Sequence, residues 1–401
     1  MLSLEEVVER TLESVPFLGC ENVKLEAALG RFAEVDLKAK ESLPRFDNSA
    51  MDGYAVKSAD LKKAAATNPV TLNCIGVVPA GQSAAKELRN GTCMRIFTGS
   101  PIPSGTDAVI MQEDCIPDAK KKTVQCLDHV RPWENIRMQG EDVKSEEIVV
   151  GRGTKINSGA IGLLAATGHH EVNVGQQPKI ALVATGSELV EAPSRLAPGK
   201  IYDSNRSMLA SMVSLINGLP KTYPIVNDTL DETVTALEKA FNENDVILTS
   251  GGVSVGDHDH VKPALEKLGG QIDLWKVSIK PGKPFMLGQA FDKPLFGLPG
   301  NPASALVTYL LLVRPALLKM QGASNCRLAR RHGHLAMEMI NRGDRRHFVR
   351  VAIDEEGEVT SAGGQRSHML GSLAKANGII DVAANTRLAS GEKVEVLMID
   401  G

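Results

Sequence analysis

Between residues 179 and 320, short apolar runs alternate with helical patterns, and this alternation constrains the fold more than any other feature of the chain. The apolar runs are long enough for single buried strands and lie at residues 180–184, 222–226, 246–249, 272–277, 285–287 and 295–298. Helical patterns lie between or after them: at residues 206–217, at 229–241, in a stretch that ends at residue 268, and at 301–320. Such alternation is typical of a parallel, doubly wound sheet, so the sequence predicts a central α/β domain.

The strand predicted at residues 246–249 runs into a glycine-rich loop, Ser250-Gly-Gly-Val-Ser-Val-Gly256. A glycine-rich loop alone is more often a structural turn than a ligand site. In open α/β sheets, however, ligands bind beyond the carboxyl ends of the strands. Four carboxylates follow predicted strands and are expected to converge at that edge: Glu188, Asp228, Asp257 and Asp259. Carboxylate oxygens are the ligands that Mg²⁺ prefers, so we expect this metal there.

Basic groups follow later strands of the same domain. Lys276 precedes Lys280-Pro-Gly-Lys-Pro284, a loop whose prolines and glycine hold Lys280 and Lys283 in place. Gly297-Leu-Pro-Gly-Asn-Pro302 is a second rigid turn, and it leads into a helix N-terminus, where anions bind. Carboxylates for a metal, fixed lysines and helix N-termini together suit phosphoryl-group chemistry. The chain contains neither a P-loop nor a Rossmann glycine motif.

Segments on either side of the α/β domain are predicted to fold separately. A capping box at Ser3 and Glu6 predicts a first helix that ends near Pro16, and a second short helix is expected at residues 25–29. Residues 70–77, 92–97 and 108–112 are short β-like runs broken by Gly, Pro and Asn, and they indicate a small, mainly β domain. Alternating patterns beyond residue 322 indicate a C-terminal β domain.

Composition excludes several classes of protein. A hydrophobic content of 43% and a charged content of 23% are those of a soluble globular chain. A net charge of −3 gives no electrostatic argument for a nucleic-acid partner. The six cysteines form no Cys-x-x-Cys pair, so we expect neither a zinc site nor a disulfide framework. The longest apolar run, residues 305–313, is too short to span a membrane, and no signal peptide is visible, so we expect a cytoplasmic protein.

Seven motifs stand in the order found in one family. They are Ser49-Ala-Met-Asp-Gly-Tyr54, Arg95-Ile-Phe-Thr-Gly99, Gly140-Glu-Asp142, Thr185-Gly-Ser-Glu-Leu189, Ser250-Gly-Gly-Val-Ser-Val-Gly256, Lys280-Pro-Gly-Lys-Pro284 and Gly297-Leu-Pro-Gly-Asn-Pro302. Together they resemble the MoeA family of molybdopterin molybdenumtransferases, which is similar to the E domains of gephyrin and of its plant counterpart. Each motif alone is a weak signal, but seven in register across the whole chain are specific.

The resemblance implies a reaction in which adenylylated molybdopterin and molybdate yield molybdenum cofactor and AMP, with Mg²⁺ as cofactor. It also implies a homodimer whose active cleft joins the α/β domain of one subunit to the small β domain of the other. The implied domains are residues 1–45 plus 142–174 (split N-terminal), 46–141 (small β), 175–322 (α/β) and 323–401 (C-terminal β). Catalytic roles are implied for Asp52, Thr98, Asp142, Glu188, Asp228, Asp259, Lys276 and Lys280, with Glu188, Asp228 and Asp259 as the metal ligands. Substrate contacts are implied for Ser250, Gly251, Gly252, Ser254, Lys283, Pro299, Pro302, Arg350 and Ser367.

The chain departs from the family pattern at three positions. The family often has an aromatic residue at His260, glycine at Arg366 and an acidic residue near His347. The last two weaken the transfer of function to Arg350 and Ser367. His258 and His260 flank Asp259, so a transition-metal site is an alternative that ranks below Mg²⁺.

Two other functions compete with the metal-insertion enzyme. The first is the adenylyltransferase of the same pathway, which is similar in the α/β domain and is also a candidate partner; the domains on either side argue against it. The second is a gephyrin-like scaffold, which should carry a linker and a further domain that the domain prediction does not include. In all three cases the expected ligands are small molecules, with no nucleic-acid or membrane partner.

Overall fold

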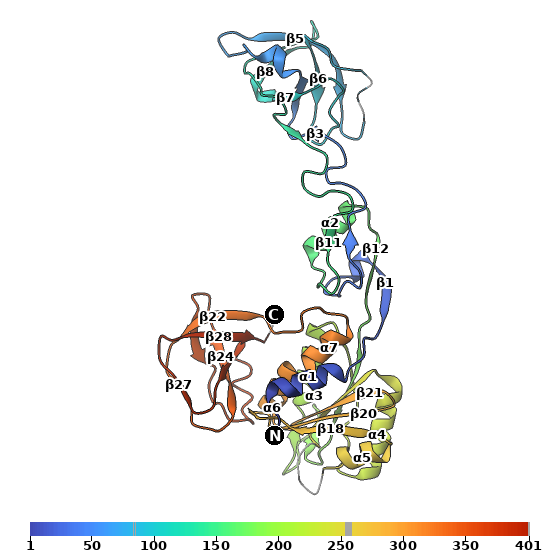
Figure 1. The fold of residues 1–401 in the computed structure, drawn as a ribbon, viewed down its shortest axis with the longest axis vertical. Helices are drawn as coiled ribbons and strands as arrows, with labels where there is room; N and C mark the ends of the chain where they lie inside the picture. Colours follow the sequence, from blue (N-terminus) through green and yellow to red (C-terminus); the bar gives the residue numbers. More distant parts are fainter. Residues whose placement is uncertain (83, 85, 253–258, 400–401) are drawn as a thin grey trace.

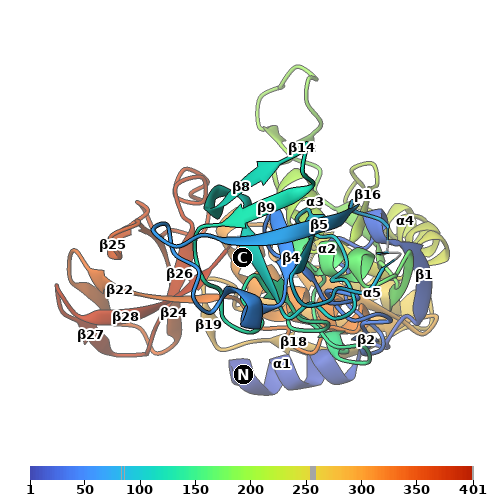
Figure 2. The same cartoon turned by 90° about the horizontal axis from the view of Figure 1, so that it is seen from above.

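The computed structural model describes residues 1–82, 84, 86–252 and 259–399. They form an elongated molecule with a broad base, a narrow middle and a separate body at the far end (Figure 1). The base holds the central α/β sheet and, beside it, the C-terminal β body. Figure 2, which looks along the long axis, shows that the C-terminal body lies to one side of the central sheet.

The central sheet has the strand order β16-β13-β17-β21-β20-β18. Its strands are β13 (Lys179–Ala184), β16 (Leu219–Thr222), β17 (Val246–Ser250), β18 (Gln271–Lys276), β20 (Pro284–Ala290) and β21 (Lys293–Leu298). The first four strands in the sheet are parallel, whereas β20 is antiparallel to both of its neighbours. The prediction of a parallel sheet is therefore wrong for β20. Phe291 and Asp292 join β20 to β21 with positive φ angles of 52° and 57°, and a two-residue turn of this kind joins antiparallel strands.

One strand of this sheet lies earlier than predicted. The sequence placed a strand at residues 222–226, but the paired segment is β16 at Leu219–Thr222. Beyond it, Val226 makes only an isolated bridge to Thr185. Pro224 lies between them and has no N–H to donate, so the ladder is interrupted there.

Helices cover both faces of the sheet, so the doubly wound architecture is confirmed. Their bounds are α3 (Asn205–Leu215), α4 (Leu230–Glu243), α5 (Val261–Lys267) and a long helix over Pro302–Met320. α3 and the long helix pack on the face that carries Ile180, and α4 and α5 pack on the face that carries Ala181. Burial on both faces explains why these strands read as continuous apolar runs.

The long helix consists of α6 (Pro302–Thr308), the π-helical turn η4 (Tyr309–Val313) and α7 (Arg314–Met320). Among the described helices it alone is long and apolar enough to cross a membrane, but 94% of it is buried inside the protein. It is therefore a core helix. Asn301 stands at its N-cap as predicted, although the side chain makes no capping hydrogen bond.

Helix α1 (Leu4–Glu13) begins with the predicted capping box. The Glu6 N–H donates to Ser3 Oγ (3.2 Å), and the Ser3 N–H donates to the Glu6 carboxylate (2.8 Å). Leu4 and Val7 pack into the core that contains the long helix. α1 thus shares a core with the base, although the sequence grouped it with the N-terminal domain. A short amphipathic helix gains most of its stability from an apolar partner, and the long helix supplies that partner.

The narrow middle is built from two segments that are far apart in the chain. Its elements are β1 (Cys20–Lys24), η1 (Leu25–Ala27), β2 (Leu37–Lys38), β11 (Ile148–Val150), α2 (Ser158–Ala166) and β12 (Glu171–Gly175). β1 pairs with β12 and β2 pairs with β11, both antiparallel. The short helix predicted at residues 25–29 is only the 3-10 turn η1.

The distal body is inserted between β2 and β11 and has a six-stranded sheet of order β7-β4-β6-β5-β9-β8. Its elements are β3 (Asn48–Ser49), β4 (Gly53–Val56), η2 (Ser58–Leu61), β5 (Val70–Val78), β6 (Thr92–Ile96), β7 (Ala108–Met111), η3 (Gln112–Asp114), β8 (Cys115–Asp118), β9 (Thr123–Cys126) and β10 (Ile136–Arg137). The predicted small β domain is confirmed as a fold.

The C-terminal body is a sheet of order β19-β24-β25-β22-β28-β26, and an additional pairing of β24 with β26 closes five strands into a barrel. Its strands are β22 (Arg330–Leu335), β23 (Met339–Asn341), β24 (Arg346–Ile353), β25 (Glu358–Ser361), β26 (Gly378–Val382), β27 (Thr386–Leu388) and β28 (Lys393–Met398). β19 (Ile279–Lys280) comes from the base and pairs with β24. The base therefore donates an edge strand to the C-terminal sheet. The exact domain boundaries stay a prediction.

Candidate active site

The central sheet has a topological switch point between β13 and β17, because the chain passes from β13 to β16 on one side and then to β17 on the other. Ligands bind outside the carboxyl ends of the strands at such a point. The loops that follow β13, β17 and β21 meet there. The Gly251 N–H donates to Leu298 O (3.1 Å), and a Cβ on Gly251 would lie 2.8 Å from Thr185 O. Gly251 and Gly252 have φ angles of 87° and 71°, so the close approach of these loops requires glycine.

Three of the predicted carboxylates lie on loops at this edge of the sheet. Asp228 follows β16 and accepts a hydrogen bond from the Ser187 N–H (2.8 Å), which ties its loop to the loop after β13. Glu188 is exposed on that second loop, and Asp259 is half-buried shortly before α5.

Across the described ranges, no three His, Cys, Asp or Glu side chains form a group that could hold a metal ion. The predicted convergence of carboxylates is therefore not found as a preformed metal site in that part of the chain. β16 and β17 stand two strand spacings apart, about 10 Å, so carboxylates on their loops share an edge without sharing a coordination sphere. Ser254, Asp257 and His258 lie outside the described residues.

Ser250, the last residue of β17, takes part in the hydrogen bonds that connect these loops. It is 4% exposed, and its hydroxyl accepts a hydrogen bond from Asn205 Nδ2 (2.7 Å). The same amide donates to Gly300 O (2.8 Å). The Asn205 amide, at the start of α3, thus connects the ends of β17 and β21.

The predicted lysines lie at the other half of the same edge. Lys276 is the exposed last residue of β18, and it pairs with Pro284 at the start of β20. Lys280 and Lys283 are exposed on the segment that crosses to the C-terminal sheet. The edge is therefore polarised, with carboxylates beyond β16, β13 and β17 and lysines beyond β18 and before β20.

A cavity of about 640 Å³, here called the basic pocket, opens between the lysine loop, the start of the long helix and the C-terminal barrel. It is lined by Lys280, Pro281, Gly282, Lys283, Pro284, Asn301, Ser304, Arg345, His347, Gln365, Arg366, Ser367 and His368. Lysine, arginine and histidine supply its charged and titratable groups, and no Asp or Glu stands among these lining residues. A cavity lined by one sign of charge concentrates ions of the other sign, so this pocket suits an anion.

Arg350 lies behind the pocket and is fully buried. Its guanidinium donates to Ser372 Oγ (2.9 Å) and to the carbonyls of Gly364 (2.8 Å) and Arg366 (3.2 Å). It thereby fixes the loop that carries Gln365 and Ser367. Nη1 has no hydrogen-bond partner among the described residues, and burying an unpaired charged donor is costly.

His347 lines the pocket and is 8% exposed. Burial, and after it the charges of Lys280, Arg350 and Arg345, together lower the pKa of its imidazole from 6.5 to about 4. The side chain is therefore neutral at pH 7. Lys280 is its register partner in the β19–β24 pairing.

The start of the long helix is less available to an anion than the sequence predicted. Pro302 has no N–H, and the Ala303 N–H donates to Ser367 O (3.0 Å). This bond brings Ser367 to the helix N-terminus and joins the C-terminal body to the base. Pro299 is buried in the turn before the helix.

Asp52 and Thr98 form a pair in the distal body. Asp52 Oδ1 accepts hydrogen bonds from the Thr98 N–H (2.8 Å) and the Thr98 hydroxyl (2.9 Å), and these bonds hold the pKa of the carboxyl below its usual range. Asp142 is exposed on the segment that returns from the distal body. Within one chain, the distal body lies far from the sheet edge, so these residues are not brought to the other predicted site residues (Figure 1).

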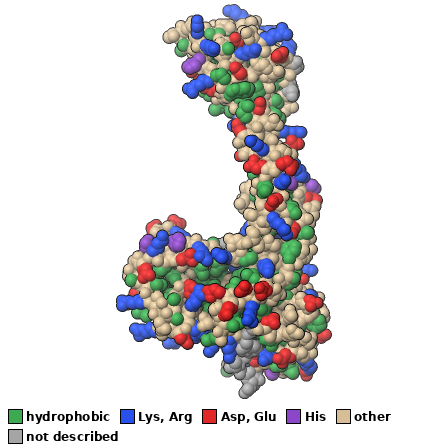
Figure 3. All heavy atoms as spheres, viewed as in Figure 1, with side chains coloured by type: hydrophobic (Ala, Val, Ile, Leu, Met, Phe, Trp, Pro, Cys, Tyr) green, Lys and Arg blue, Asp and Glu red, His purple; other side chains and the backbone are tan. Residues whose placement is uncertain are grey.

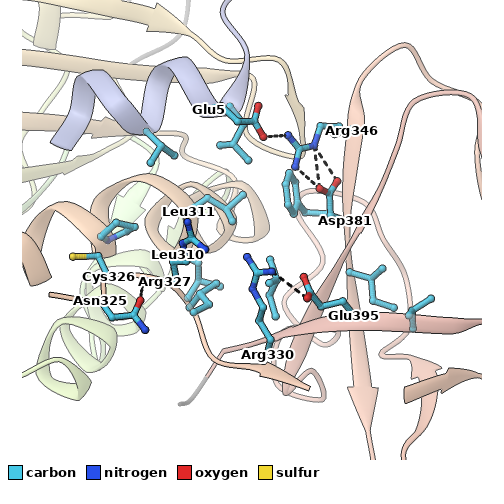
Figure 4. Close-up of a pocket in the computed structure, with 18 of the residues that line it drawn as sticks. Glu5, Leu310, Leu311, Asn325, Cys326, Arg327, Arg330, Arg346, Asp381 and Glu395 are labelled. Atoms are coloured by element: carbon cyan, nitrogen blue, oxygen red, sulfur yellow. Dashed lines mark hydrogen bonds and ion pairs between the residues drawn. The ribbon is translucent and has the colours of Figure 1, made fainter. Parts of the chain in front are cut away.

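A second cavity, of about 1020 Å³, separates α1 and the long helix from the C-terminal barrel. Figure 4 shows Arg346 between Glu5 and Asp381, and Arg330 paired with Glu395. Arg346 links α1 to β26, with Nε at 3.0 Å from Asp381 Oδ2. Of these ion pairs, Arg346–Glu5 joins the barrel to the base, whereas Arg346–Asp381 and Arg330–Glu395 lie within the barrel.

The surface outside these cavities carries no dominant charge on the face in Figure 3, where acidic and basic side chains are interspersed over all bodies. Sequence reasoning missed Arg345, Gln365 and His368 as pocket residues and treated His347 and Arg366 only as departures from the family. The run Arg345-Arg346-His347 before an apolar strand was the available signal. The pairing of β19 with β24, which brings this run to Lys280, could not be read from the chain.

Comparisons with known proteins agree with this architecture. Residues 2–168 match the MoeA N-terminal region (domain I and II), residues 181–319 match a probable molybdopterin binding domain, and residues 332–399 match the MoeA C-terminal region (domain IV). A molybdopterin molybdenumtransferase of Haemophilus influenzae is 37% identical over 99% of this chain and 98% of that protein. A protein of the same name from Bacillus subtilis is 34% identical over 99% of this chain and 94% of that protein.

The solved structure of a molybdopterin biosynthesis MoeA protein from Pyrococcus horikoshii is 31% identical. It superposes with a TM-score of 0.85 over 99% of this chain and all of that chain. The motifs, the folds of all bodies and the full-length identity agree. The chain therefore belongs to the MoeA family of molybdopterin molybdenumtransferases, which are transferases of molybdenum cofactor biosynthesis.

Proposed function

We propose that the chain joins molybdate to adenylylated molybdopterin and releases AMP and molybdenum cofactor. The observation that carries this proposal is the basic pocket at the end of a sheet edge whose other half is acidic. Its lining of lysine, arginine and histidine, without Asp or Glu among the described lining residues, suits a small oxyanion such as molybdate. The buried guanidinium of Arg350 adds a positive charge behind it.

The polarised edge also suits the length of the nucleotide substrate. Three strand spacings separate β13 from β20, so the acidic and basic halves lie about 14 Å apart. In this proposal, the phosphates of the pterin nucleotide bind to backbone groups of Gly251 and Gly252. Ser250, behind these glycines, and Ser254 belong to the same phosphate site. Lys276, Lys280 and Lys283 hold oxyanions as point charges. Pro299 and Pro302 shape the turn between the two halves, and Ser367 contacts the molybdate.

Mg²⁺ is part of the proposal, with Asp228, Asp259 and Glu188 as its ligands. Their hard oxygen atoms fit the ion chemically, but in the described residues they form no closed cluster. Mg²⁺ keeps several waters and is commonly held by one or two carboxylates together with substrate phosphates, so the residues fit an ion that binds with the nucleotide. When bound, it would neutralise phosphate charge during release of AMP.

Asp52, Thr98 and Asp142 enter the proposal through a second subunit. Their distance from the sheet edge within one chain supports a homodimer in which the distal body of one subunit completes the edge of the other. We further propose that the enzyme acts in the cytoplasm and receives its substrate from the adenylyltransferase of the same pathway.

The test is AMP release from adenylylated molybdopterin, measured with and without molybdate and with EDTA. AMP that appears only with molybdate, disappears under chelation and returns with added Mg²⁺ supports the whole proposal. Full single-turnover release in metal-free buffer contradicts the metal role. Release of AMP that does not depend on molybdate contradicts the transfer reaction itself.

A further inference from the structure

His347 occupies an unusual position for a titratable group. It lies on β24 in the wall of the basic pocket, is 8% exposed, and its Nε2 has no hydrogen-bond partner among the described residues. A buried imidazole nitrogen without a partner is destabilising unless something in the functional state compensates for it.

The elements that line the basic pocket around His347 present positive charge. Lys280 on β19 is its register partner, and Lys283 follows on the same segment. Arg345 precedes it and is anchored by a bond from Nη1 to Ile279 O (2.8 Å). The facing loop contributes Arg366 and His368, and Arg350 lies behind that loop.

The carboxylates beside this strand pairing are already paired with arginines. Asp381 lies beside Val382, the β26 partner of His347, and is held by Arg346. Asp344 is 89% exposed and lies 3.8 Å from Arg345. Burial, reinforced by positive charge from Lys280, Arg350 and Arg345, therefore keeps the imidazole neutral.

A dianion in the pocket reverses this balance. Two negative charges close to His347 offset the neighbouring cations, and a hydrogen bond from the ring favours its charged form. We propose that Nε2 of His347 donates a hydrogen bond to a tetrahedral oxyanion bound in the basic pocket, and that the imidazole takes up one proton from solvent as the anion binds. This inference rests on the proposed function of the pocket as the oxyanion site.

The consequence is that the affinity of the basic pocket for the anion depends on pH through His347. Molybdate stays a dianion across roughly pH 6 to 8, where an imidazole changes its charge most readily. We expect its affinity for the wild-type protein to fall as the pH rises, by up to about tenfold per pH unit, because one proton is bound with each ion. The same titration in two buffers with different enthalpies of ionisation gives the proton uptake directly, which should approach one per ion at the acid end.

His347→Gln should remove the proton uptake and flatten the pH dependence, because an amide can donate to the anion but does not titrate. His332→Gln is the matched control, since His332 is exposed on β22 of the same barrel and outside the pocket. It should keep the wild-type slope. Wild-type protein that binds molybdate without proton uptake overturns the inference, as does a His347→Gln variant with an unchanged slope.

A second measurement needs no variant. In protein labelled at histidine, the His347 resonance should titrate with a pKa of about 4 without ligand. With molybdate bound, its pKa should rise towards neutral. Inorganic phosphate is titrated separately: a response to molybdate alone identifies free molybdate as the ion, and a response to phosphate alone identifies a substrate phosphate. A His347 titration that neither anion moves contradicts the inference.

Failure of the proposed function gives a different experimental result from failure of the role of His347. If Lys280→Ala binds molybdate as tightly as the wild type, the pocket is not the oxyanion site at all. If Lys280→Ala weakens binding and His347 still does not titrate with the anion, only the role of His347 is wrong.

Discussion

The two halves of the sheet edge are built in different ways. The basic pocket is assembled from fixed parts: a buried Arg350 that holds a loop by three hydrogen bonds, a buried His347, and a strand donated from base to barrel. The acidic half consists of loop carboxylates that are exposed or half-buried and that form no metal cluster in the described residues. From this difference we expect the basic half to bind an ion alone, and the acidic half to be completed only by ligand, metal or a second subunit. Four predictions test this contrast, from the largest expected effect to the smallest.

Asp228→Ala and Asp259→Ala should each lower AMP release about a thousandfold while the fold remains intact. In the proposed function these carboxylates hold Mg²⁺, and without it repulsion between two charges at 4 Å would cost about 4 kcal/mol at an effective dielectric near 20. Single-turnover kinetics measure the loss, and circular dichroism monitors the fold. Asp273→Ala, an exposed carboxylate within β18, is the control and should be neutral. Normal turnover in either site variant would remove the acidic half from the reaction.

Mixing inactive Asp52→Ala with inactive Asp259→Ala should restore about a quarter of the wild-type rate. Random reassociation makes about half of the dimers mixed, and each mixed dimer has one intact cleft if the distal body acts across subunits. Each variant mixed only with itself is the control. No recovery in proven heterodimers, or an active monomer by light scattering, would mean that the acidic half is not completed in trans.

Lys280→Ala should weaken molybdate binding by about tenfold to a hundredfold, since a charge-assisted hydrogen bond is worth about 1.5–3 kcal/mol. Wild-type affinity should fall as salt rises because the exposed lysine is screened. Calorimetry at two salt concentrations measures both effects, with Lys239→Ala on the surface of α4 as the matched control. Salt-independent binding that is unchanged in Lys280→Ala would show that the preassembled pocket holds no oxyanion.

His347 should make the protein less stable in acid. Its pKa is about 4 in the folded protein against an ordinary 6.5, so below pH 6.5 the unfolded chain binds a proton that the folded state rejects. The stabilisation is complete above pH 6.5 and is lost as the pH falls towards 4, by about 2–3 kcal/mol. His347→Gln should therefore show a flatter dependence of thermal midpoint on pH over this range than the wild type or His332→Gln. Parallel curves for all three proteins would mean that His347 is not held neutral in the pocket.

Local features of the chain were sufficient for much of the fold. The capping box at Ser3 was found where the sequence predicted it, and so were the apolar strands of the central sheet apart from β16, which lies earlier. The glycine-rich loop after β17 was visible in the sequence, and the meeting of three loops at Gly251 requires glycine there. Such features depend on neighbours within a few residues, so a pattern in the sequence is enough to reveal them.

Contacts between distant segments were decided only by the tertiary structure. The chain could not show that β19 leaves the base to pair with β24, that Ser367 caps the long helix, or that α1 packs in the base. It could not show that Asp228 and Asp259 belong to no preformed metal cluster within the described residues. Register and docking depend on which apolar faces and unpaired backbone groups meet in space, and these partners lie tens to hundreds of residues apart. The residue types at the site could therefore be read from the sequence. The placement of His347 beside Lys280, in contrast, was set by a strand pairing that no local pattern encodes.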